Sequence, residues 1–323
     1  MSVLRDVAWP PLDAARGNRR LWRGLVDRVG AAAAIAMLTL PWAQSAIEQN
    51  PAEPAMTAAR GSGTETRSVS TLPAKEVLVA TYAGAPYTYP SNVTVTKPGT
   101  HDFTAKDVHW AGEPFKSPIY YGVRIARWFE GGRTGTMLDF THSKAIAERE
   151  NETEFHGTLN GKPAPARPKI SDVFSKLEAS HGHNMLTFNG LIRLPNVGLR
   201  LSPYAGIGAG VALPHSEVQF AGEDARTFEY QYAGPVVQAL VGLELRLPRV
   251  SYFLEYKFTI ARYEMPLSNQ EGYILWTDLW RQLRRWLDGE APPGGTLQTR
   301  FSSHQVIGGM GVRILAAPAA VGP

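Results

Sequence analysis

Strand-like segments separated by alternately short and long gaps run through the chain from about Glu76 onward, and this rhythm limits the fold more than any other feature. Apolar residues alternate with polar or small ones in eight segments, at about 76–84, 117–129, 134–145, 183–194, 199–212, 228–247, 251–264 and 299–313. The gaps after the second, fourth and sixth segments are short, at 130–133, 195–198 and 248–250, and the other gaps are long. A transmembrane β-barrel with both ends in the periplasm has this pattern, because its periplasmic turns are short and its extracellular loops long. We therefore predict an all-β fold, an eight-stranded antiparallel transmembrane β-barrel over residues 76–314.

The alternation also predicts which side chains face lipid, since successive side chains of a strand point to opposite faces. In the segment 228–247, Val241 and Leu243 share the apolar parity and Glu244 the other. In the segment 251–264, Tyr256 is expected to face lipid and Lys257 the interior. Hydropathy averaged along such strands stays ordinary, and the mean hydropathy of the chain is −0.19.

Charged and polar residues fall on the inward parity of several segments. The interior of an eight-stranded barrel is just wide enough for side chains to fill, and an unpaired buried charge is costly. We therefore expect a buried ion network rather than a channel, formed by Arg124, Asp139, Asn189, Glu255 and Lys257. Asp139 and Glu255 are also candidate catalytic residues, as orienting groups below the extracellular end.

The N-terminal region predicts export. Several arginines precede an apolar run at 29–40, and a stretch of small residues follows it. This order is typical of a secretory signal, and the run is shorter than the about 20 residues of a transmembrane helix. We predict a signal peptide at 1–46, a disordered linker at 47–75 that is rich in Ala, Pro, Ser, Thr and Gly, and a C-terminal tail at 315–323. A short membrane anchor is the alternative for the first segment.

Composition narrows the classes of function. The chain has no cysteine, which excludes thiolate metal sites and cysteine nucleophiles. Its net charge of +4 comes largely from the first 28 residues, and no basic stripe interleaved with aromatics occurs in the strand region, so we expect no nucleic-acid partner. The predicted location is the outer membrane of a Gram-negative bacterium, as a monomer.

Histidines and carboxylates gather where the predicted strands reach the extracellular end. His142, His215 and Glu217 are candidate catalytic residues, because imidazole is a suitable base near neutral pH. His183, in a His-x-His pattern, and His304 are candidate metal ligands.

The run His215-Ser216-Glu217 also suggests a hydrolase. A triad is defined by the spatial roles of its members, however, and not by proximity in sequence.

The last long gap contains the one segment with helical periodicity. Apolar side chains recur at spacings of three and four, at Trp276, Leu279, Trp280, Leu283, Trp286 and Leu287. Arg281, Arg284 and Arg285 fall on the polar side, and this composition is typical of a helix at a membrane surface. The three arginines, Trp280 and Lys144 are candidate substrate-binding residues, because arginine suits bidentate binding of lipid phosphates. A lid folded over the barrel mouth is the alternative for this extracellular-loop helix.

Several short runs lie in order across about 77–314. They are Gly-Ala-Pro-Tyr-Thr-Tyr-Pro (84–90), Pro-Ile-Tyr-Tyr-Gly-Val-Arg (118–124), Leu-Asp-Phe-Thr-His-Ser-Lys (138–144), Pro-Tyr-Ala-Gly-Ile-Gly-Ala-Gly-Val-Ala-Leu-Pro-His (203–215), Tyr-Gln-Tyr-Ala-Gly-Pro-Val-Val-Gln (230–238), Glu-Tyr-Lys (255–257) and Ser-His-Gln-Val-Ile-Gly-Gly-Met-Gly-Val-Arg (303–313). By their order and number these runs resemble the outer-membrane lipid A oxidase family. The resemblance implies an eight-stranded barrel that oxidises the proximal glucosamine of lipid A to 2-aminogluconate, using O₂.

Oxidation needs an acceptor for two electrons, and no side chain here accepts two electrons. The sequence has no dinucleotide or flavin fingerprint, so the cofactor is unknown, with a divalent metal that works with O₂ as one option. A lipid A deacylase on the same kind of barrel and a non-enzymatic structural or adhesive barrel are the alternatives.

Overall fold

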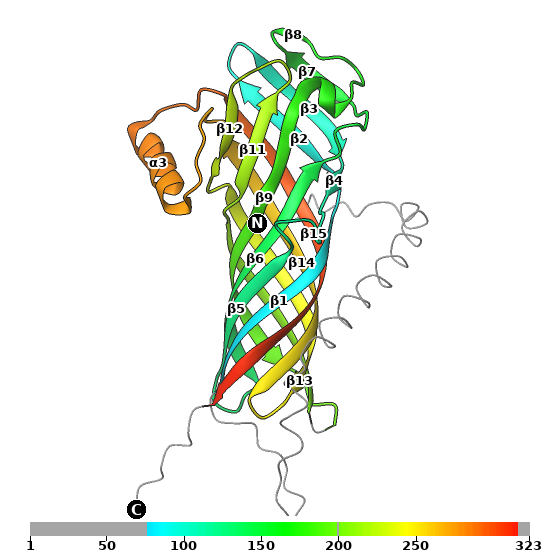
Figure 1. The fold of residues 1–323 in the computed structure, drawn as a ribbon, viewed down its shortest axis with the longest axis vertical. Coiled ribbons are helices and arrows are strands. Elements are labelled where there is room, and N and C mark those ends of the chain that lie inside the picture. Colours follow the sequence, from blue (N-terminus) through cyan, green and yellow to red (C-terminus); the bar gives the residue numbers. More distant parts are fainter. Residues whose placement is uncertain (1–75, 199, 316–323) are drawn as a thin grey trace, which may run out of the picture. The chain divides into compact units, whose positions relative to one another are not determined.

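A closed ring of strands is the main feature of the computed structural model, which describes residues 76–198 and 200–315 (Figure 1). Within these residues eight strands form the ring, and their order around it follows their order in the chain. They are β1 (Glu76–Thr88), β5 (Tyr121–Trp128), β6 (Thr134–Ala147), β9 (Phe174–Arg193), β10 (Leu201–Ala212), β13 (Gly234–Arg246), β14 (Val250–Pro266) and β15 (Thr296–Leu315). The predicted barrel is confirmed. The predicted signal peptide, linker and the tail from residue 316 lie outside the described residues.

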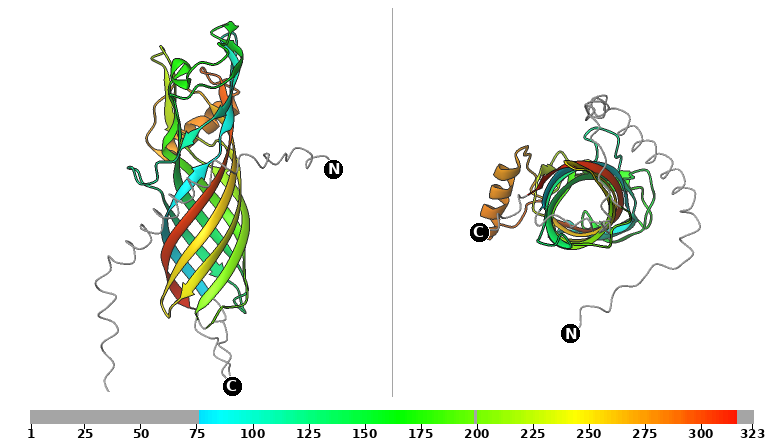
Figure 2. Two further views of the ribbon diagram at one scale, coloured as in Figure 1. Left: turned by 90° about the vertical axis from the view of Figure 1, so that its right-hand side faces the viewer. Right: turned by 90° about the horizontal axis from the view of Figure 1, so that it is seen from below.

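Pairing between the first and last strands closes the ring (Figure 2). β1 runs antiparallel to β15, from the pair Glu76–Leu315 to the pair Thr88–Ser303. The other neighbouring strands of the ring are antiparallel as well. The short connections β5–β6, β9–β10 and β13–β14 lie at the end that holds Glu76, as the sequence predicts for the periplasmic end.

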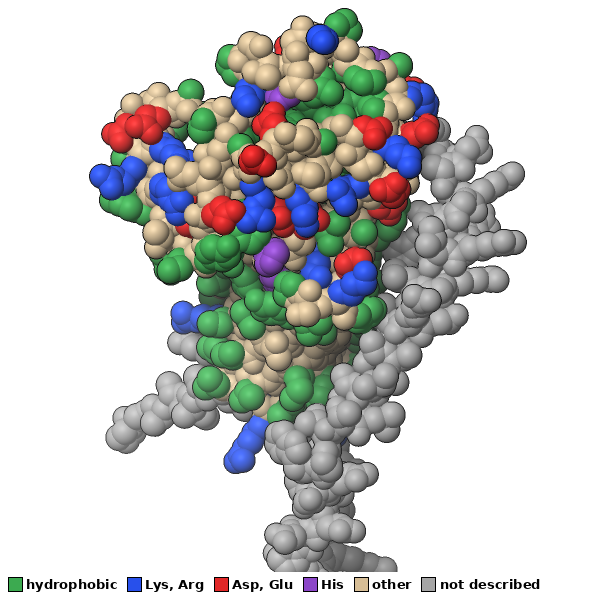
Figure 3. All heavy atoms as spheres, turned by 45° about the horizontal axis from the view of Figure 1, so that its top comes forward, with side chains coloured by type: hydrophobic (Ala, Val, Ile, Leu, Met, Phe, Trp, Pro, Cys, Tyr) green, Lys and Arg blue, Asp and Glu red, His purple; other side chains and the backbone are tan. Residues whose placement is uncertain are grey.

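Exposed apolar side chains surround the ring, and we call them the apolar belt. They include Val79, Val123, Ile125, Leu138, Phe188, Ile192, Ile207, Val237, Val241, Leu254, Val312 and Ile314. The predicted faces are confirmed: Leu243 is 40% exposed, whereas Glu244 and Lys257 are 2% and 0% exposed. Figure 3 shows charged side chains gathered above the apolar surface.

The barrel interior is filled by a charge-balanced network, as predicted. Arg124 donates two hydrogen bonds to Glu255, at 2.8 and 3.0 Å, and its Nε donates to Asp139 at 3.2 Å. Lys257 Nζ donates to the second oxygen of Asp139 at 2.6 Å. Asn189 joins the network through Gln238, whose Nε2 donates to Asn189 Oδ1 at 3.0 Å. Two cations and two carboxylates therefore compensate one another inside a closed wall.

A second set of ion pairs lies at the periplasmic end. Glu76 accepts hydrogen bonds from Arg193 at 3.1 Å, Arg246 at 2.6 Å and Arg313 at 2.9 Å. Arg193 also donates to Glu244 at 2.9 Å. Because Glu76 lies on β1 and Arg313 on β15, this set spans the seam where the first strand meets the last.

The closed antiparallel ring pairs the backbone groups of neighbouring strands and exposes no strand edge to lipid. Its outer belt is apolar and its interior is polar. These are the features of the β-barrels of Gram-negative outer membranes. The protein is an eight-stranded outer-membrane β-barrel.

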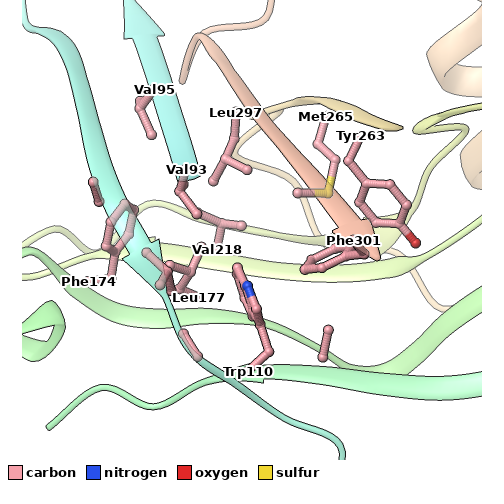
Figure 4. Packing of buried hydrophobic residues seen from close by; sticks show 14 of the residues in the cluster. Val93, Val95, Trp110, Phe174, Leu177, Val218, Tyr263, Met265, Leu297 and Phe301 are labelled. Atoms are coloured by element: carbon pink, nitrogen blue, oxygen red, sulfur yellow. The ribbon is translucent and has the colours of Figure 1, made fainter. Parts of the chain in front are cut away.

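Several strands continue beyond the membrane and form an extracellular extension. β9, β14 and β15 have 20, 17 and 20 residues, more than the about 9–11 that cross a bilayer. The extension adds β2 (Ser91–Lys97), β3 (His101–Val108), β4 (Trp110–Ala111), β7 (Phe155–Leu159), β8 (Lys162–Pro163), α2 (Ile170–Val173), β11 (His215–Phe220) and β12 (Arg226–Tyr230). These elements enclose an apolar core of their own (Figure 4). Val93, Phe174 and Leu297 are fully buried in it.

The structure corrects several of the predicted segments. The first long gap was expected to be a loop, yet it forms β2, β3 and β4. The fourth strand begins at Phe174 rather than at residue 183, and the second long gap also contains β7, β8 and α2. The predicted sixth strand, 228–247, is divided into β12 and β13. These segments depart from the lipid-facing pattern because they face water on one side and the extracellular core on the other.

The topology gives a first testable prediction. A peptide tag inserted between Gly131 and Gly132, in the β5–β6 turn, is expected to be hidden from antibody on intact cells. The same tag beside Gly161, in the β7–β8 turn, is expected to be accessible, because that turn belongs to the extracellular extension. Permeabilised cells are the control, in which both tags react. Labelling of the tag at Gly131 on intact cells would invert the topology.

Candidate functional site

His142 lies on the outer wall of the barrel near the extracellular end of β6. Its neighbour Thr141 points inward, where Lys257 Nζ donates to its hydroxyl at 3.1 Å, so alternation turns His142 outward. The His142 ring stacks on Tyr121 of β5, with ring centroids 4.8 Å apart. Tyr121 is 39% exposed, whereas His142 is only 5% exposed. The imidazole therefore lies under an aromatic ring at the edge of the apolar belt.

Hydrogen bonding fixes the tautomer of His142. Asn184 donates its Nδ2 to the carbonyl oxygen of Leu213 at 3.2 Å, so its Oδ1 is the acceptor that faces His142. His142 Nδ1 must then carry the proton and donates to Asn184 Oδ1 at 2.8 Å. The other nitrogen, Nε2, is buried and has no partner among the described residues. It presents a lone pair.

His215 of β11 has the same arrangement with the nitrogens exchanged. Its Nε2 donates to the carbonyl oxygen of Gly272 at 2.9 Å, and its Nδ1 is buried without a partner in the part of the chain that the structure describes. The rings of Phe228 and Tyr230 contact it, with centroids 4.3 and 4.5 Å away. Burial holds the pKa of His215 below 6.5, so the imidazole is neutral at pH 7.

His181 contacts His215, and Asn184 contacts His142. The exposed ring of His181 lies 5.5 Å from that of His215. Asn184 bonds to His142 through one amide atom and, through the other, to Leu213, two residues before His215. We call His142, His181 and His215 the outer-wall histidines. The sequence placed His142 and His215 at one end of the barrel, but Asn184 was missed, because its role depends on the register between β6 and β9.

Glu217 shares the outward parity of β11 with His215 and is held in ion pairs. Arg226 Nη1 donates to Glu217 Oε1 at 3.1 Å, and Lys176 Nζ lies 3.9 Å from the same oxygen. Burial raises the pKa of Glu217 above its usual value. The other two catalytic candidates, Asp139 and Glu255, belong to the interior network, so the structure divides the predicted set between the two sides of the wall.

The serines next to the candidate histidines point the other way. Ser216 Oγ donates to Gln231 Oε1 at 3.1 Å on the inner side, between the outward His215 and Glu217. Ser180 is on the outer wall and lies 3.2 Å from His181 Nδ1, but it donates to Glu178 at 2.8 Å. In a hydrolytic triad the histidine stands between serine and carboxylate. Here the Ser180 hydroxyl lies between His181 and Glu178, and Ser216 lies between His215 and Glu217 in the chain.

The two candidate metal ligands do not converge. His183 points into the barrel and its Nδ1 is hydrogen-bonded to the Tyr263 hydroxyl. His304 has the outward parity of β15 and interacts with the hydroxyls of Tyr89 and Tyr256. Among the described residues no three His, Asp or Glu side chains are placed to hold a metal ion. These residues do not fit the predicted metal, and we derive no step through one.

Helix α3 (Leu275–Asp288) carries most of the candidate substrate-binding residues and lies beside the barrel wall (Figures 1 and 2). It does not cover the ring, so the alternative of a lid over the mouth is wrong. None of the described helices is long and apolar enough to cross a membrane. Trp280 is 58% exposed, and Arg284 is also exposed.

The remaining candidates in this group face the protein. Arg281 is paired with Asp278 at 2.6 Å, and Arg285 is half-buried. Lys144, on β6, donates to the carbonyl oxygens of Lys116 at 2.9 Å and Ser117 at 3.3 Å. Of the predicted phosphate ligands, only Arg284 is exposed in the structure.

No family model matches the chain, and no curated protein does either. Solved structures similar to it include Neisserial surface protein A, with 10% identity over 75% of this chain and 97% of that chain and a TM-score of 0.32. Ail, the attachment invasion locus protein of Yersinia pestis, solved with the heparin analogue sucrose octasulfate, has 10% identity over 74% and 99% and a TM-score of 0.30. The outer membrane protease OmpT from Escherichia coli has 8% identity over 77% and 100% and a TM-score of 0.35. At these TM-scores the similarity carries no argument, and the fold rests on the strand pairing described above.

Proposed function

We propose that this outer-membrane barrel is an enzyme that modifies lipid A, by O₂-dependent oxidation of the proximal glucosamine to 2-aminogluconate. The observation that carries the proposal is the pair of oriented imidazoles on the outer wall. His142 and His215 each donate one N–H to the protein and each keep a buried lone pair on the other nitrogen. Fixing the tautomer in this way prepares a histidine to accept a proton. Their position at the edge of the apolar belt suits a substrate held in the outer leaflet.

We assign His215 as the base, because it is neutral at pH 7 and its Nε2–H is already committed to Gly272. Its Nδ1 removes the proton of the anomeric hydroxyl. His142 accepts a hydrogen bond from a second sugar hydroxyl through Nε2. The sugar reaches these nitrogens by displacing the rings around them, of which Tyr121 and His181 are exposed.

The reaction balances with O₂ as the oxidant. Oxidation of the anomeric C–OH removes two electrons and two protons, which O₂ takes up as H₂O₂, and water then opens the resulting lactone to the aminogluconate. The anomeric oxygen must carry a hydrogen, so the substrate is lipid A with a free anomeric hydroxyl. The resemblance to lipid A oxidases supports this reaction over the alternatives.

The test is mass spectrometry of such a lipid A after incubation with the folded protein in detergent. We expect a gain of one oxygen atom, dependence on O₂ and formation of H₂O₂. A matched incubation with the double variant His142→Gln/His215→Gln is the control and is expected to leave the lipid unchanged. Loss of an acyl chain would instead establish a deacylase, and an unchanged lipid with the parent protein would support a structural or adhesive barrel.

A further inference from the structure

The amphipathic helix α3 is inverted relative to helices that pack on a protein core. Its large apolar side chains are exposed, with Trp276 at 77%, Trp286 at 75% and Leu287 at 66%. Asp278 is the only residue of the helix that is buried within the described chain, at 1% exposure. A helix on a soluble protein normally turns its apolar stripe to the core and its charges to solvent. The apolar stripe of α3 therefore faces something other than the barrel.

The polar side of α3 is fixed to the barrel by specific hydrogen bonds. Asp278 Oδ2 accepts from the backbone N–H of Tyr230 at 3.2 Å, and Oδ1 accepts from Arg281 at 2.6 Å. Gln282 exchanges two hydrogen bonds with the backbone of Tyr232, at 2.8 and 2.9 Å. The orientation of the helix about its own axis is thus set by polar contacts, and the outward direction of the tryptophans follows from it.

The backbone of Gly272 packs closely against the Asp278 side chain, which holds the polar side of α3 toward the protein. A side chain on Gly272 would place its Cβ 2.1 Å from an oxygen of Asp278, so any other residue there would displace the Asp278 carboxylate from its hydrogen bonds. The carbonyl oxygen of the same Gly272 accepts the hydrogen bond from His215. Gly272 therefore contacts both α3, through Asp278, and His215, whose ring it orients.

The anchor points lie next to the upper edge of the apolar belt. Tyr232, which holds Gln282, is 49% exposed and comes two residues before β13 begins at Gly234. The outward side chains of β13 belong to the belt, starting with Pro235 and Val237. The exposed face of α3 thus adjoins the surface that contacts lipid, and Figure 1 shows the helix at the side of the molecule, next to β12.

We propose that the apolar face of α3, formed by Trp276, Trp280, Leu283 and Leu287, lies in the hydrocarbon at the outer edge of the lipid bilayer. Continuity with the apolar belt identifies the occupant as acyl chains. Tryptophan and leucine opposite a charged face are the composition of helices that lie in a membrane interface. The inference does not depend on the reaction proposed above, since it concerns where the helix rests and not what the histidines do.

Site-directed spin labelling tests this proposal without background, because the chain has no cysteine. A nitroxide is attached to Leu283→Cys in the folded protein in phosphatidylcholine vesicles. Collision rates with O₂, which concentrates in hydrocarbon, and with a water-soluble nickel chelate are compared. Val241→Cys on the apolar belt is the lipid reference, and Lys162→Cys, at the exposed first residue of β8, is the water reference. Asp288→Cys, at the exposed end of the same helix, is the matched control.

We expect the O₂-to-nickel collision ratio at 283 to match that at 241 and to exceed those at 162 and 288 several-fold. A ratio at 283 equal to that at 162 would place the apolar face in water and overturn the proposal. Spin–spin broadening at 283 that persists when the protein is diluted in lipid would place a second copy there and overturn it too. Heat-modifiable migration confirms folding of each variant, and Trp280→Cys, on the same face, replaces Leu283→Cys if that variant does not fold.

Discussion

Replacement of Arg124 by methionine is expected to destabilise the barrel by about 3–5 kcal/mol, because it removes one partner from a buried ion network. Arg124 is 4% exposed and makes a two-bond pair with Glu255 and a third bond to Asp139. Without it, Lys257 is the remaining cation for two carboxylates. Among the described residues, Glu255 then keeps the hydroxyl of Tyr204 as its hydrogen-bond donor, at 2.7 Å.

Urea unfolding in vesicles, followed by heat-modifiable gel migration, measures this loss. Arg127→Met is the matched control, since Arg127 lies on the same strand with its side chain exposed on the outer face, and its loss is expected to change stability little. The double variant Arg124→Met/Glu255→Met should recover part of the loss, because it removes the unpaired carboxylate as well. Equal unfolding curves for Arg124→Met and the parent protein would contradict a structural role for the network.

The sequence predicts which residues form the interior network but not how they pair. Inward parity was enough to predict that Arg124, Asp139, Glu255 and Lys257 are buried together. Parity does not show which carboxylates Arg124 pairs with. Glu255 lies 131 positions from Arg124 in the chain, whereas Asp139 lies only 15 positions away, yet Arg124 bonds to both. That pairing depends on barrel closure and on the register of strands that meet only after folding.

The extracellular extension was missed although part of its signal is present. Val93 and Val95 on β2, and Phe103 and Ala105 on β3, alternate with exposed or half-exposed residues and are fully buried or nearly so. This is the alternation of a strand with one face on a core. These segments are short and their other face is polar, so they lack the apolar outward face by which lipid-facing strands are identified.

The site was predicted in part for a similar reason. The strand ends brought His142 and His215 to one level, and the 3–4 spacing defined both faces of α3. The sequence could not show which face of α3 meets the barrel, because the contact that decides it joins Asp278 to the backbone N–H of Tyr230. Alternation alone, however, separates Ser216 from its neighbours His215 and Glu217, and the serine does point inward.

Substitution of His215 by glutamine is expected to reduce the rate of lipid A oxidation by about 10²–10⁴-fold, the usual contribution of a general base. Glutamine still donates a hydrogen bond to the carbonyl oxygen of Gly272 but cannot take up a proton at neutral pH. His304→Gln is the matched control, because His304 also lies on the outer face but interacts with Tyr89 and Tyr256 instead of the outer-wall histidines. We expect that variant to oxidise lipid A like the parent protein. Equal loss in both variants would locate the base elsewhere.

The pH profile separates a base from a residue that only supports the fold. Burial lowers the pKa of His215, so the neutral form required of a base persists below pH 6.5 and is lost only as the pH falls through the lowered pKa. The parent enzyme should therefore keep its full kcat/KM at pH 7 and lose it along an acid limb whose midpoint lies below 6.5. In His215→Gln this limb should disappear from the residual activity, because no proton is then taken up at that position. A residual activity that keeps the same acid limb would show that another group titrates, and would leave His215 a structural residue.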